Sequence, residues 1–153
     1  MITALLLLLA VCPLHEQHMA EARHDTFGFS HESSKHAFRL FDDGGAIELR
    51  ATKESDAATI AAIRKHLQSI ASEFTKSDFS TPHFVHDKTP AGVATMQRLT
   101  NAIQYRYEEL PAGARVRIRT TDAEALKAVQ DFLRWQIAEH QTGDSGNVER
   151  DQN

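Results

Sequence analysis

The sequence contains a single cysteine, Cys12, close to its N-terminus. One thiol cannot form a disulfide within the chain, and covalent haem attachment through a C-x-x-C-H motif needs two. Haem c is therefore excluded. Packing, and not cross-linking, has to stabilise the fold.

Motifs typical of enzymes are also absent. The sequence has no G-x-S-x-G nucleophile elbow and no H-E-x-x-H metalloprotease motif. Gly44 and Gly45 lead into a second predicted strand instead of a helix, so no phosphate-binding loop and no nucleotide cofactor are expected. Glu108 and Glu109 are adjacent and would diverge on a strand, which does not suit a catalytic carboxylate pair. The sequence therefore favours a binding protein, either with or without a metal ion. A metal-dependent enzyme ranks behind both of these.

An excess of positive charge is missing as well. Lys and Arg number 17 against 21 Asp and Glu, a formal net charge of -4, which argues against binding to nucleic acid. The mean hydropathy of -0.41 and the 25% of charged residues fit a globular protein in water. With 153 residues the chain provides one hydrophobic core and one domain.

The long apolar run Ile2 to Val11 is shorter than the roughly 20 residues that a membrane-spanning helix needs. Its length is that of a signal-peptide core, and Ala20-Glu21-Ala22 has the small residues that a signal peptidase prefers. We therefore expect residues 1–22 to be a signal peptide, with export to the periplasm or secretion and no membrane span after cleavage. Lipoprotein anchoring at Cys12 is the less favoured alternative, because Val11 stands where a small residue is usual.

Hydrophobic periodicity predicts two hairpins, each followed by a helix. Residues alternate in polarity from His36 to Phe41 and from Ile47 to Thr52, with turn residues between, which predicts the first hairpin. Apolar residues then recur every three or four positions from Ile60 to Phe74, which indicates a helix. The same order recurs with a hairpin over residues 103–119 and a helix over residues 126–137. A ββα unit used twice would explain this order.

These elements predict an α+β fold. It is a two-layer sandwich in which a four-stranded, mainly antiparallel sheet carries two helices on one face. Residues 35–144 would form this single domain, after an N-terminal arm of residues 23–34 and before a polar, disordered tail of residues 145–153. We expect function in the connection between the two units, residues 77–96, which contains two prolines and two histidines.

Nine histidines are the unusual feature of the composition. His36 shares a predicted strand face with Phe38, and His140 continues the apolar stripe of the second helix. Neutral imidazoles beside a carboxylate suit zinc, copper, nickel or iron. The candidate metal ligands are His31, His36, His86 and His140, with Asp87 and His66 as lesser candidates. The alternative for any one of them is a hydrogen-bonded histidine at the edge of the core.

The opposite face of the predicted sheet offers a metal-free alternative. Guanidinium groups bind carboxylates and phosphates through two parallel hydrogen bonds. A periplasmic binding module for an anionic ligand or a protein partner could use the arginines predicted to point away from the helices: Arg50, Arg106, Arg115, Arg117 and Arg119. Ion pairs with glutamates of the same face are the other interpretation of these arginines.

Several short blocks of the sequence stand out: Phe27–His31, His36–Leu40, Gly44–Glu48, His86–Asp87 and two pieces between Phe132 and Asp144. In these blocks the chain resembles a group of small, uncharacterised exported bacterial proteins that often carry an automatic label of aspartate carbamoyltransferase. The resemblance implies an exported small domain and supplies no catalytic residues. The label is not supported, because that enzyme uses a Ser-Thr-Arg-Thr phosphate loop and the nearest string here is Arg117–Thr121. Aspartate carbamoyltransferase activity is therefore not expected.

Overall fold

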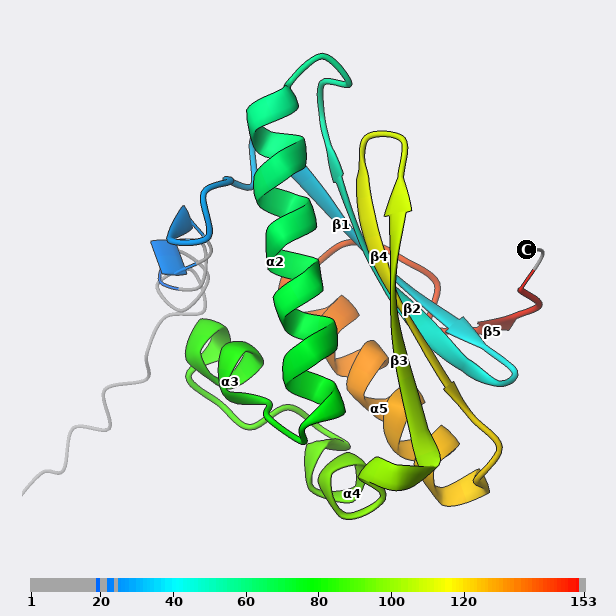
Figure 1. Ribbon diagram of the computed structural model, residues 1–153. Helices are drawn as coiled ribbons and strands as arrows, with labels where there is room; N and C mark the ends of the chain where they lie inside the picture. The colour runs from blue at the N-terminus through cyan, green and yellow to red at the C-terminus, as the bar shows by residue number, and fades with distance from the viewer. Residues whose placement is uncertain (1–18, 20–21, 24, 152–153) are drawn as a thin grey trace, which may run out of the picture.

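The computed structural model describes residue 19, residues 22–23 and residues 25–151 (Figure 1). The predicted signal peptide lies outside these residues, apart from Met19 and Ala22. The elements follow in the order β1 (Ser34–Phe41), β2 (Gly44–Ala51), α2 (Ala57–Thr75), α3 (Ser80–His86), α4 (Val93–Arg98), the short 3-10 turn η1 (Thr100–Ala102), β3 (Ile103–Leu110), β4 (Gly113–Thr120), α5 (Ala123–His140) and β5 (Val148–Glu149).

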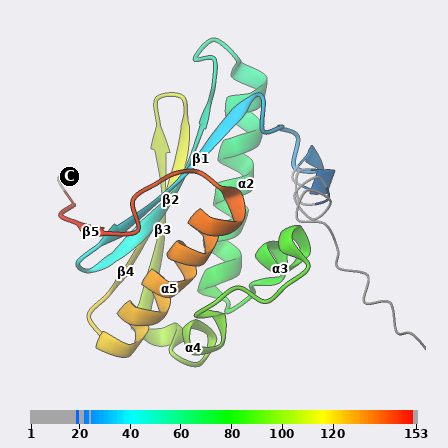
Figure 2. The same ribbon diagram turned by 180° about the vertical axis from the view of Figure 1, so that it is seen from behind.

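The strands form one mixed sheet in the order β3-β4-β2-β1-β5. Each pairing among β1, β2, β3 and β4 is antiparallel, whereas β5 pairs with β1 in parallel. Helices α2 and α5 lie on the same face of the sheet, as the two opposite views show (Figures 1 and 2). The predicted α+β class with a mainly antiparallel sheet is confirmed. The detail differs, because the structure adds a fifth strand and the two short helices α3 and α4.

Each long helix lies mainly over the hairpin of the other unit. Helix α2 follows the β1–β2 hairpin in sequence but makes most of its contacts with β3 and β4, whereas α5 contacts β1 and β2 more than β4. The central pairing of β2 with β4 joins the two hairpins, with Ile47 opposite Val116. The core of either unit is therefore completed by the other.

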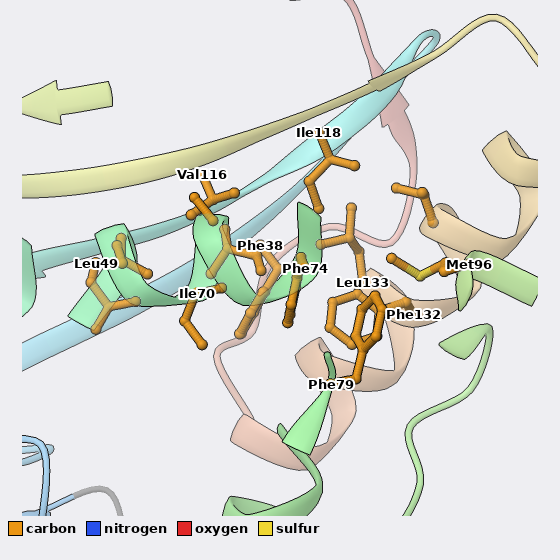
Figure 3. Packing of buried hydrophobic residues seen from close by; sticks show 14 of the residues in the cluster. Phe38, Leu49, Ile70, Phe74, Phe79, Met96, Val116, Ile118, Phe132 and Leu133 are labelled. Atoms are coloured by element: carbon orange, nitrogen blue, oxygen red, sulfur yellow. The ribbon is translucent and has the colours of Figure 1, made fainter. Parts of the chain in front are cut away.

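The core fills the space between the sheet and the helices (Figure 3). Helix α2 begins after Asp56, whose Oδ1 accepts a hydrogen bond from the N–H of Thr59 at 3.0 Å. The apolar stripe predicted for this helix is buried at Ile63, Leu67, Ile70 and Phe74. None of the helices in the described part of the chain combines the length and apolar character needed to span a bilayer.

The connection between the two units packs tightly against α5. Helix α3 ends at Asp87 in a left-handed conformation, and α4 begins after Gly92, whose φ is 79°. A Cβ atom on Gly92 would lie 2.1 Å from the carbonyl oxygen of Ala128, so only glycine permits this approach. This packing brings His86, the last residue of α3, beside the C-terminal end of α5.

The tail, for which the sequence predicts disorder, contains the two-residue strand β5. Val148 pairs with Leu40, and Glu149 forms an ion pair with Arg39 at 3.1 Å. Before the tail, an oxygen of Asp144 accepts a hydrogen bond from the N–H of Phe38 at 2.8 Å. These contacts cover part of the outer edge of β1.

Candidate functional site

Five histidines from separate segments meet at one end of the helix layer. We call them the histidine cluster: His31 from the N-terminal arm, His36 from β1, His66 from α2, His86 from α3 and His140 from α5. They include every histidine that the sequence singled out as a candidate ligand. All but His31 line a cavity of about 50 Å³ whose other walls are mostly apolar.

The rings of His36 and His140 form the centre of the cluster. Their centroids are 4.7 Å apart and their planes are inclined by 22°, which is a stacked arrangement. The His31 ring lies 5.8 Å from that of His36 and 6.3 Å from that of His140. His31 is exposed, whereas His36 and His140 are half-buried, so His31 marks the solvent side of the cluster.

His86 forms the inner end of the cluster. Its ring centroid lies 4.8 Å from that of His140 and 4.8 Å from that of Trp135, edge to face in both cases. The Nε2 atom lies 3.2 Å from Oε1 of Gln136, and Nδ1 lies 3.9 Å from a carboxylate oxygen of Glu139. With the Gln136 oxygen as acceptor, Nε2 carries the hydrogen and Nδ1 keeps its lone pair.

His66 belongs to an aromatic wall formed by the N-terminal arm. The Phe27 ring lies 4.3 Å from the His66 ring, and the Phe29 ring lies 5.4 Å from it. The arm is held in place at its start by Arg23, which donates a hydrogen bond to the carbonyl oxygen of Val85 at 3.3 Å. The His66 ring therefore packs against two phenylalanines of the arm.

Burial keeps three of these imidazoles neutral near pH 7. Burial, and secondly the proximity of His31, His66 and His86, lowers the pKa of His36 to about 3. Burial also lowers the pKa of His66 to about 4. For His86 burial outweighs the opposing effect of the hydrogen bond with Gln136 and lowers the pKa to about 4. Neutral imidazoles have a nitrogen lone pair available for a metal ion or a hydrogen-bond donor.

The nitrogen atoms do not converge as the rings stand. Within the described residues, no three His, Cys, Asp or Glu side chains are arranged to hold one metal ion. The sixth candidate, Asp87, lies outside the cluster: its side chain is 80% exposed and pairs with Arg23 at 3.5 Å. Asp87 thus contacts the N-terminal arm through Arg23.

The five arginines of the opposite sheet face are already paired with carboxylates. Arg115 contacts Glu108 at 2.6 Å, and the other short contacts join Arg50 to Glu48, Arg106 to Glu108, Arg117 to Asp43 and Asp151, and Arg119 to Asp43. Arg117 is buried and also stacks on the Phe41 ring, 4.6 Å from its centroid. The face therefore presents ion pairs to an incoming anion.

Sequence reasoning missed two parts of the site. One is Gln136, which is buried on the same helix face as Leu133; a polar amide inside an apolar stripe is a recognisable signal. The other is the pair Phe27 and Phe29 of the arm, whose spacing does not indicate contact with His66.

The comparisons with known proteins give no further guidance. No family model, curated protein or solved structure matches this chain.

Proposed function

We propose that this protein binds a transition-metal ion in the histidine cluster, with His36, His86 and His140 as ligands and His31 at the solvent side. One observation carries the proposal: imidazoles from an arm, a strand and two helices, far apart in sequence, form a continuous series of ring contacts beside one cavity. The ions that suit imidazole ligands are those of zinc, copper, nickel and iron.

The ring separations support a shared ion. Two imidazoles that share a metal through bonds of about 2.1 Å at a tetrahedral angle have ring centres roughly 5 Å apart. The His36–His140 and His86–His140 centroid distances of 4.7 and 4.8 Å are close to this value. Because His36 and His140 are stacked, binding requires their rings to turn about the Cβ–Cγ bonds, a torsion with a broad energy well.

The surroundings of His86 suit a ligand. Metal-ligating histidines usually donate their second ring N–H to an oxygen acceptor, which fixes the tautomer and the ring orientation. Gln136 supplies such an acceptor to Nε2 of His86, which leaves Nδ1 for the ion. The proposed role of these residues is ligation, and a bound ion would supply Lewis acidity at the cavity.

A calorimetric titration tests the proposal. The chain, stripped of metal, is titrated with Zn²⁺, Cu²⁺ and Ni²⁺, and the same is done with His36→Phe/His140→Phe, which keeps two aromatic rings but removes two ligands. His83→Phe is the matched control, because His83 is an exposed histidine of the same helix as His86. Circular dichroism establishes that each variant is folded.

We expect one saturable site in the wild-type chain and in His83→Phe, and at least a hundredfold weaker binding in the double variant, since two of the ligands are lost. Equal binding by the double variant and the wild type would show that the ion lies elsewhere. No binding by the folded wild-type chain would exclude the proposed function.

We further propose that the four core strands and two long helices arose by duplication of one ββα unit. The two hairpins match at a constant offset, with Gly44 of β2 corresponding to Gly113 of β4. A Cβ on Gly44 would lie 2.1 Å from the carbonyl oxygen of Ile118, and one on Gly113 would lie 2.0 Å from that of Leu49. Ile118 and Leu49 are themselves equivalent under the same offset, so both halves use one close contact in the same way.

A further inference from the structure

Strand β3 forms one edge of the sheet and is not covered as β1 is. At the other side, β5 and Asp144 cover part of the outer edge of β1. In the described part of the chain no strand pairs with the outer edge of β3, which lies along one side of the sheet in Figure 1. An edge of this kind is a template for pairing with another strand.

The register shows which backbone groups face this edge. Leu110 and Gly113 flank a two-residue turn and therefore form a hydrogen-bonded pair. Because bonding alternates along the strand, the N–H groups that point outward belong to Tyr105, Tyr107 and Glu109. None of these three N–H groups has a hydrogen-bond partner within the described residues.

The edge also lacks several of the features that block pairing. All eight residues of β3 are in continuous register with β4, without a bulge, and the strand contains no proline, glycine or lysine. Two of its three charged residues, Arg106 and Glu108, flank Tyr107, and the third is Glu109. The Arg106 side chain is 77% exposed.

A groove beside the edge could receive the side chains of an added strand. It has a volume of about 530 Å³ and runs between β3 and α2, where it is lined by Tyr107, Glu109, Ile60 and Lys65 among others. Ile60 and Tyr107 are partly buried against the core, so the floor of the groove is partly apolar. Burying such a surface on association is favourable.

We propose that two copies of this chain associate through β3 as an antiparallel strand pair. The two-fold axis lies between Tyr107 of one copy and Tyr107 of the other. In this register the outward N–H and C=O groups of Tyr107 meet those of Tyr107 in the second copy. Arg106 lies directly opposite Glu108 of the second copy, twice in the interface, and opposite charges so placed stabilise a strand pair. The contact is isologous, so it closes at two copies.

The association is weak and reversible, because one strand pair and its groove form a small interface. Sedimentation equilibrium over a wide range of protein concentration measures this association directly. A chelator in the buffer separates association from metal binding. We expect the average mass of the wild-type chain to rise from one copy towards two as the concentration increases.

Two variants and a matched control locate the interface. Tyr107→Pro removes an outward N–H without removing a bond to β4, and Arg106→Glu places a carboxylate opposite Glu108 of the second copy. Lys35→Glu makes the same charge reversal at an exposed position of β1. We expect both β3 variants to weaken association at least tenfold, and Lys35→Glu to leave it within twofold of wild type.

Two results would overturn the proposal. A wild-type chain that stays a single copy at every concentration would show that β3 does not pair with a second copy. A dimer that Arg106→Glu and Lys35→Glu change equally would show that the interface lies on another surface. Arg106→Glu decides the matter even if Tyr107→Pro does not fold.

Discussion

Protonation of His36, His66 and His86 opposes folding. The ordinary histidine pKa is 6.5, whereas in the folded protein that of His36 is about 3 and those of His66 and His86 are about 4. Between these values the unfolded chain binds more protons than the folded one, so the free energy of unfolding falls as the pH falls.

We therefore expect full stability above about pH 6.5 and a progressive loss from there towards pH 4. Urea unfolding of the metal-free chain at successive pH values measures it. One pKa unit corresponds to about 1.4 kcal/mol, so each of the three histidines can contribute up to a few kcal/mol to this loss. His36→Phe should reduce the slope, because it removes one of the three groups. If the free energy of unfolding falls with pH between 6.5 and 4 as steeply in His36→Phe as in the wild type, the lowered pKa of His36 is contradicted.

The single tryptophan reports on the inner end of the histidine cluster. Trp135 contacts the ring of His86 edge to face at 4.8 Å. Cu²⁺ bound at His86 should quench Trp135 fluorescence, because a paramagnetic ion bound to a ring that contacts the indole deactivates its excited state. We expect stoichiometric quenching in the wild type and in His83→Phe, and none at equal Cu²⁺ in His86→Phe. Quenching that survives in His86→Phe would place the ion away from this residue.

For single residues the sequence predicts which face of a strand or helix a side chain occupies, but not which side chains it contacts. Alternation put His36 beside Phe38, and the apolar stripe of the second helix ended at His140; both side chains line the cavity. The contact of His86 with Gln136, 50 positions away, could not be predicted, because periodicity says which face a residue occupies and not which element meets it.

Among the elements, the two hairpins depend on equivalent glycines. Gly44→Ala and Gly113→Ala would each place a Cβ about 2 Å from a backbone oxygen of the neighbouring strand, which has to move. We expect each to lower the free energy of unfolding by about 2–4 kcal/mol. Gly146→Ala is the control, because its Cβ would come no closer than 3.9 Å to other atoms. Chemical denaturation that finds either hairpin variant as stable as Gly146→Ala would refute this account.

A carboxylate of the C-terminal tail pairs with a buried arginine of β4. Arg117 is 1% exposed, and its Nε donates a hydrogen bond to Asp151 at 2.8 Å. Asp151→Asn removes a charge that faces a buried guanidinium, so we expect a loss of about 1–3 kcal/mol in the free energy of unfolding. Glu149→Gln breaks only the exposed pair with Arg39 and should cost at most about 0.5 kcal/mol. Equal losses for the two variants, in the same denaturation assay, would count against a structural role for Asp151.

At the element scale, length decided what the sequence could predict. The hairpins and the helices α2 and α5 contain enough turns or alternations to show a period. Helix α3 has 7 residues and β5 has two, so neither shows a period that could be recognised. Short elements are stabilised by tertiary contacts, such as that of Gly92 with α5, which a sequence pattern does not reveal.

In the whole molecule, the histidine cluster depends on the assembly of both units. His36 and His66 belong to the first unit, His140 to the second and His86 to the connection between them. Since the long helices lie over each other's hairpins, no half of the chain brings these rings together. An ion that binds the assembled cluster and not the unfolded chain would stabilise the entire fold.

The most direct test of the metal site is elemental analysis of the chain, expressed without a histidine tag and purified without chelator. We predict about one equivalent of zinc, copper, nickel or iron in the wild type and in His83→Phe, and its loss in folded His36→Phe/His140→Phe. No metal in the wild type, or the same amount in the double variant, would contradict the account.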